Sequence, residues 1–185
     1  MFVLLAASIL AVVAGLRAAS AVRARADGPP PPGRSATWYA TYGEAALRAG
    51  RPDRALAAAR FETRADPGAA DAWARRAHAA TRVAGGPDRE ALRALTRAMD
   101  LSPYPPAEQM TWRVAYAEAY WSAIPDALGM RMLGQIDALA AMNTAWDARI
   151  AWCAGSRVEA VAAAACATTP GVEQGTWLPD GPAAP

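Results

Sequence analysis

Alanine most constrains what this chain can fold into, because it fills 51 of the 185 positions. Alanine is the best helix former, and its single methyl group lets two helices approach closely. The apolar share of 54% therefore predicts a core built from many small side chains instead of a few large ones. The composition predicts an all-α fold.

The remaining composition disfavours catalysis. All 19 basic side chains are arginine, and the chain has a single histidine. Without lysine there is neither a Schiff-base lysine nor a phosphate-loop lysine, and one histidine cannot build a multi-histidine metal site. We therefore expect a protein that is not an enzyme and holds no cofactor or metal. A hydrolase whose carboxylates converge only in space is the remaining enzymatic alternative.

The charge pattern argues against nucleic acid as a partner. The net charge is only +2, and the arginines are spread along the sequence. Nucleic-acid interfaces need basic side chains gathered on one face, usually with aromatic residues between them. We expect protein partners instead.

The first 22 residues predict a membrane anchor. Residues 2–16 (FVLLAASILAVVAGL) carry no charge and would span roughly 22 Å as a helix. Continuing to Val22 approaches the roughly 30 Å of a hydrocarbon core, with Arg17 close enough to the end to reach the headgroups. Ala19-Ser20-Ala21 also fits a signal-peptide cleavage site. A cleaved signal and a soluble helix are therefore the alternatives.

Proline and glycine mark the other boundaries. Residues 23–34 include four consecutive prolines, which lack amide donors and hold a polyproline II conformation, so this segment is predicted to be a semi-rigid spacer. Residues 35–167 form the predicted helical domain. Residues 168–185 are rich in proline and glycine without an apolar period, which predicts a disordered tail.

Glycine and proline also cut the domain into helices with short connections, which favour antiparallel neighbours. The predicted helices cover residues 35–49, 52–64, 69–83, 88–100, 107–122, 125–143, 144–154 and 157–167.

The first two hairpins repeat, with 36 residues between Pro67 and Pro103. Each has a small residue within its first helix, a glycine that ends this helix, an alanine early in the second helix and a closing proline. The matching pairs are Gly43 with Ala77, Gly50 with Gly85, Ala55 with Ala91, and Pro67 with Pro103.

These residues, with Tyr42, Trp73 and Ala98, resemble the signature of tetratricopeptide repeats over residues 37–103. The resemblance implies a solenoid of stacked hairpins, with two clear repeats, a divergent third hairpin and a C-terminal cap. Glu62 departs from the pattern, because the family prefers alanine there. Tyr104-Pro105-Pro106 also departs, in the third hairpin. The alternative fold is an irregular helical bundle.

The resemblance implies a concave groove, lined by the first helix of each hairpin, that binds a peptide. The alignment puts Glu44 and His78 in one column of this groove and Arg48 and Arg82 in the next. Two arginines in equivalent positions could hold an acidic peptide by bidentate hydrogen bonds. The alternative is that both are solvated surface residues.

An aromatic stripe is the second candidate surface. Trp112, Tyr116 and Tyr120 step by four residues and therefore share one face of a helix. Packing in the core is the default interpretation of this spacing, and an exposed docking surface is the alternative.

Cys153 and Cys166 are the only cysteines. A pair is compatible with a disulfide in an oxidising compartment or with two buried thiols. A continuous helix over 157–167 would place Cys166 about three turns from Cys153, too far to bridge. A shorter or bent helix would permit the disulfide.

The sequence predicts a non-catalytic interaction scaffold in a bacterial inner membrane, binding proteins in or at that membrane. The layout, including Leu101-Ser102-Pro103-Tyr104, also resembles anchored helical-repeat proteins of surface-polysaccharide synthesis and export. That resemblance implies a periplasmic domain, which is the orientation we expect. The arginines that follow the anchor predict a cytoplasmic domain, which is the alternative. The alternative function is a structural accessory subunit of a membrane enzyme or energy-transducing complex. Oligomeric state is left open.

Overall fold

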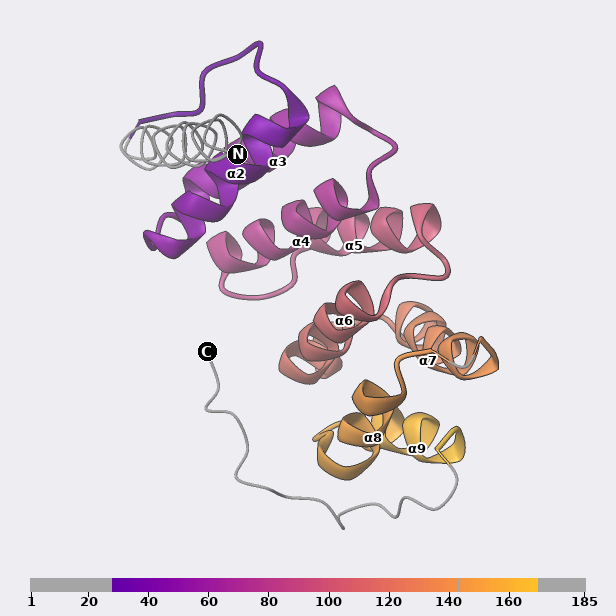
Figure 1. Cartoon of the computed structure of the whole chain (residues 1–185). Helices are drawn as coiled ribbons and strands as arrows, with labels where there is room; N and C mark the ends of the chain where they lie inside the picture. Colours follow the sequence, from indigo (N-terminus) through magenta and orange to yellow (C-terminus); the bar gives the residue numbers. More distant parts are fainter. Residues whose placement is uncertain (1–27, 143, 170–185) are drawn as a thin grey trace, which may run out of the picture. The chain divides into compact units, whose positions relative to one another are not determined.

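The computed structural model describes residues 28–142 and 144–169, and this part of the chain is all-helical, without a strand (Figure 1). The all-α prediction is confirmed, and each predicted helix begins and ends within two residues of an observed one. The helices are α2 (Ala36–Arg48), α3 (Pro52–Ala65), α4 (Ala70–Ala84), α5 (Arg89–Leu101), α6 (Ala107–Tyr120), α7 (Asp126–Ala141), α8 (Trp146–Gly155) and α9 (Glu159–Ala167), with a 3₁₀ turn η1 (Trp121–Ala123).

Local signals explain where these helices begin and end. The hydroxyl of Ser35 accepts a hydrogen bond from the Trp38 amide (3.2 Å) and caps α2. Pro52 opens α3, where its missing amide hydrogen costs nothing. Gly50 and Gly85 follow α2 and α4 with φ of 70° and 74°. A side chain would strain this left-handed backbone, so the predicted glycine turns are confirmed.

The chain divides into two compact units between Leu101 and Ser102. In the first unit α2 packs on α3, α3 on α4 and α4 on α5. The core of this unit is mostly alanine, and its larger members include Tyr39, Tyr42, Leu56, Leu95 and Met99. A methyl group added at Gly43 would lie 3.7 Å from Ala58 Cβ, an ordinary contact. Small side chains therefore let these helices approach, as the composition predicted.

The second unit contains α6 to α9 and has a core of larger side chains, including Met110, Ile136 and Trp152. Packing is tight at Gly129, where a methyl group would lie 3.0 Å from the Trp121 ring and the ring would have to shift by a few tenths of an ångström. Large side chains thus fill the core of the second unit, whereas alanine fills most of the core of the first.

Part of the predicted spacer is held against the first unit. Pro30 is buried, and Tyr39 donates from its hydroxyl to the carbonyl of Pro31 (2.9 Å). Tyr42 donates in the same way to the carbonyl of Gly28. Residues 28–31 are therefore held against α2 by hydrogen bonds from two tyrosine hydroxyl groups. The sequence did not predict this contact.

The predicted anchor, residues 1–22, lies outside the described residues, as do residues 170–185 of the predicted tail. Within the described part of the chain, no helix is both long enough and apolar enough to cross a bilayer.

Candidate functional site

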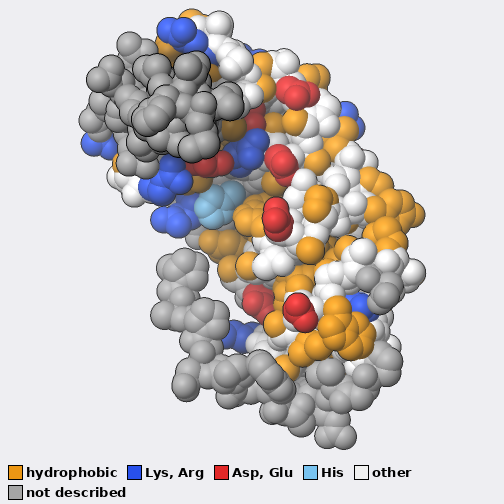
Figure 2. All heavy atoms as spheres, in the orientation of Figure 1, with side chains coloured by type: hydrophobic (Ala, Val, Ile, Leu, Met, Phe, Trp, Pro, Cys, Tyr) orange, Lys and Arg blue, Asp and Glu red, His pale blue; other side chains and the backbone are white. Residues whose placement is uncertain are grey.

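The four residues of the predicted groove lie on α2 and α4. Glu44, Arg48 and Arg82 are exposed, and His78 is half-buried. The pKa of His78 is lowered, first because burial disfavours its charged form and second because Arg82 adds a like charge. In Figure 2 the histidine side chain, in pale blue, lies beside basic side chains in blue. Glu44 instead lies within electrostatic reach of Arg75.

Arg75 forms a buried ion pair with Glu62, the residue that departs from the repeat pattern. Its Nε donates to Glu62 Oε2 at 3.1 Å, and its second guanidinium nitrogen donates to Oε1. The Glu62 side chain is 3% exposed and that of Arg75 is 31% exposed. Burial disfavours the charged guanidinium, but the hydrogen bonds and charge of Glu62 outweigh it and raise the pKa of Arg75. The pair joins α3 to α4.

Glu90 joins three helices. It accepts hydrogen bonds from Arg60 on α3 and from Arg76 on α4, the latter from Nε at 2.9 Å. The pKa of Glu90 is lowered to about 2, chiefly by the hydrogen bond from Arg60 and further by Arg76, against the opposing effect of partial burial. Arg76 also donates to the hydroxyl of Thr63 at 3.2 Å.

Buried polar side chains in the described residues all bond within the chain. In the second unit Arg113 donates to the carbonyl of Ser102 (3.0 Å) and to Gln135 Oε1 (2.7 Å). Arg149 donates to the carbonyl of Thr168 at 2.7 Å, although its Nε has no hydrogen-bond partner among the described residues. The buried polar set is Glu62, Thr63, Thr81, Arg113, Gln135, Arg149 and Thr169.

Three exposed arginines on α5 form a stripe that was not among the residues predicted from the sequence. Arg89, Arg93 and Arg97 step by four residues, so they share one helix face. The stripe borders an open cleft of about 690 Å³ that is also lined by Trp73 and Arg76. On its other side lies a shallower cleft of about 490 Å³. The four-residue spacing of these arginines is the sequence signal that could have predicted the stripe.

The aromatic stripe of α6 is largely packed. Tyr116 is buried, and its ring centroid lies 5.4 Å from that of Trp112 and 5.2 Å from that of Tyr120. Trp112 and Tyr120 are half-buried. The three rings therefore contact one another in sequence along α6, and the middle ring, Tyr116, faces the interior.

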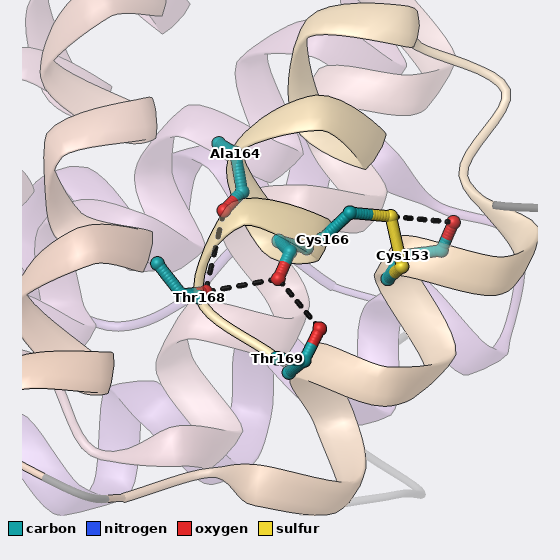
Figure 3. Close-up of a disulfide and its surroundings, with 6 residues drawn as sticks. Cys153, Ala164, Cys166, Thr168 and Thr169 are labelled. Atoms are coloured by element: carbon teal, nitrogen blue, oxygen red, sulfur yellow. Dashed lines mark hydrogen bonds between the residues drawn. A yellow bond between two sulfur atoms is a disulfide. The ribbon is translucent and has the colours of Figure 1, made fainter. Parts of the chain in front are cut away.

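A disulfide joins Cys153 on α8 to Cys166 on α9, with 4.7 Å between the Cα atoms (Figure 3). The helix starts at Glu159 instead of Arg157, and Ser156 and Val158 before it are extended. α9 therefore begins two residues later than predicted, and this shorter helix is the case in which the sequence permits the disulfide.

Two threonine hydroxyl groups cap the C-terminal end of α9 beside this disulfide. The hydroxyl groups of Thr168 and Thr169 both donate to the carbonyl of Ala165, at 2.9 and 2.8 Å (Figure 3). Cys166 Sγ lies 3.5 Å from the carbonyl oxygen of Cys153. A disulfide sulfur has no hydrogen to donate, so this is a packing contact.

The described residues hold no group of three or more histidine, cysteine, aspartate or glutamate side chains placed to bind a metal ion. Comparison with known proteins found no matching family model, no matching curated protein and no matching solved structure.

Proposed function

We propose that this chain is a non-catalytic interaction scaffold whose outer surface binds a protein partner in or at a bacterial inner membrane. The observation that carries the proposal is the use of the buried polar side chains. Glu62, Arg113 and Arg149 are the buried charged residues among those described, and each bonds to its own chain. In an enzyme, buried charged side chains often face a substrate. In this chain they connect helices instead, so we place the function on the outer surface.

The location of the scaffold is part of the proposal. Residues 1–22 are proposed as its anchor, on the length and apolar character of that segment. The disulfide between Cys153 and Cys166 supports a periplasmic domain, because such bonds persist in oxidising compartments. A tetratricopeptide-like stack and a role in surface-polysaccharide synthesis or export complete the proposal, and both rest on sequence resemblance.

Isolation of the full chain from its native membrane, after crosslinking and mild detergent extraction, tests this function. We expect specific protein partners at less than stoichiometric yield. A membrane enzyme recovered in fixed stoichiometry would instead identify an accessory subunit. Recovery of the chain alone from crosslinked membranes would contradict both functions.

Topology needs its own measurement. We would fuse after Pro185 a reporter that is active only in an oxidising compartment. This reporter should be active if the domain is periplasmic. The matched control is a fusion that lacks residues 1–22, which should leave the reporter in the cytoplasm and inactive. Activity of a cytoplasm-only reporter in the full-length fusion would reverse the proposed orientation.

A further inference from the structure

The arginine stripe of α5, Arg89, Arg93 and Arg97, is exposed and takes no part in the ion pairs that join the described helices. None of the three forms a hydrogen bond or ion pair with a described residue. Arg60 and Arg76, in the same unit, bind Glu90. Like charges four residues apart destabilise a helix, and no hydrogen bond or ion pair with a described residue offsets this cost.

The carboxylates nearest to the stripe are already engaged. Asp88 accepts a hydrogen bond from the amide of Ala91 at 2.8 Å and so caps α5. Glu90 is held by Arg60 and Arg76. The wider cleft is lined by four arginines against these two acids, which leaves it net positive.

The cleft also has an aromatic ring, Trp73, beside the guanidinium groups. Trp73 donates from Nε1 to the carbonyl of Pro67 at 3.0 Å, which fixes its ring. The Arg76 guanidinium lies 5.3 Å from the ring centroid. A bound segment would therefore meet cations from α5 and an ordered aromatic ring from α4.

We infer that this cleft is the docking site for an acidic protein segment, with carboxylates of the partner paired to Arg89, Arg93 and Arg97. The inference rests on the proposed scaffold function and names the chemistry of its partner. The arginines recur about every 6 Å over about 12 Å of helix. Carboxylates four residues apart on a partner helix recur at the same distance, and each can accept a bidentate pair from a guanidinium.

The shape and charge of the site favour a short acidic segment over other polyanions. The arginines border concave clefts, whereas a bilayer surface is flat. Asp88 lies before the stripe, and Asp100 follows it in the lining of the second cleft. A continuous polyanion such as nucleic acid would meet these negative charges at both ends of the stripe.

The test uses the full chain in detergent and a labelled helical peptide with glutamate at every fourth position. Its counterpart with glutamine at those positions is the probe control. Fluorescence anisotropy at low salt should show that the glutamate peptide binds and that binding weakens as salt rises. The variant Arg93→Gln with Arg97→Gln should bind about tenfold more weakly, since two exposed charge pairs are lost.

A matched variant, Arg64→Gln with Arg157→Gln, removes the same charge from exposed positions elsewhere and should bind within about twofold of the parent chain. Equal weakening in both variants, or none in the α5 variant, would overturn the site. Loss of binding only in Arg48→Gln with Arg82→Gln would move the site to the predicted groove. Anionic vesicles or an oligonucleotide that bind the stripe as tightly as the peptide would overturn the acidic-segment partner.

Capture from native membranes separates this inference from the proposed function. If the α5 variant still captures the partners of the parent chain, the scaffold function stands and the α5 site does not. If the parent chain captures no partner yet binds the glutamate peptide through α5, the acidic-segment site stands and the scaffold function does not.

Discussion

Glu62 and Arg75 should respond very differently to substitution, although they belong to one ion pair. The Glu62 side chain is 3% exposed, and Arg75 is its hydrogen-bond partner on α4. Arg75→Met keeps the aliphatic bulk but leaves a buried carboxylate without a counter-charge. Removing one partner of a buried pair costs about 3 to 5 kcal/mol, and we expect about 3 because water reaches the Arg75 side of the pair.

The opposite substitution, Glu62→Ala, should cost about 1 kcal/mol or less. Arg75 is 31% exposed, so its guanidinium can turn towards water once the carboxylate is gone. Alanine is also the better helix former at a position inside α3. The double variant Glu62→Ala with Arg75→Met should then be close to Glu62→Ala alone, since neither charge is left buried.

Urea unfolding followed by circular dichroism measures these differences. Hydrogen exchange of α3 and α4 amides shows whether the loss is located in the first unit. A coupling energy of about 3 kcal/mol between the two substitutions is the expected result. Equal costs for the two single variants, or additive costs in the double variant, would refute the proposed asymmetry.

Three further predictions concern other contacts. Glu90 has a folded pKa of about 2 against an ordinary 4.5, so its stabilisation is complete above about pH 5 and lost as pH falls from 4.5 towards 2. Because Arg60 is 48% exposed, screening should limit this to about 1 to 2 kcal/mol. Unfolding at pH 6 and pH 3 should show the loss in the parent chain and not in Glu90→Gln; the same pH slope in both would contradict it. Replacing Cys153 and Cys166 by alanine should destabilise α6 to α9 by about 3 kcal/mol, from the closure of a short loop, and unchanged exchange protection there on reduction would argue against the bond. Ala145 has φ of 55°, so Ala145→Gly should raise thermal stability by about 1 kcal/mol, and a lower melting temperature would exclude that strain.

The helix boundaries were predictable because their signals act within a few residues. Ser35 reaches an amide three positions away, and Pro52 opens the helix that contains it. Gly50 and Gly85 adopt a backbone that other residues avoid. Alanine content predicted the all-α class for the same reason, since propensity belongs to each residue by itself.

Long-range pairing was not predictable in this way. Glu62 differs from the alanine that the repeat pattern expects, and only its position opposite Arg75 shows the reason. Arg60 and Glu90 are 30 residues apart, on helices whose facing sides no local pattern specifies. The arginines of the predicted groove and those of α5 look alike in the sequence, and the clefts distinguish the second set.

The sequence by itself therefore determined the helices, their turns and the small-residue core. The tertiary structure decided which charged side chains form ion pairs and hydrogen bonds between helices and which face solvent. It also decided that Cys153 and Cys166 meet, through the extended residues before α9. Charge pairing and disulfide formation depend on distances between segments, and those distances are set only when the helices pack.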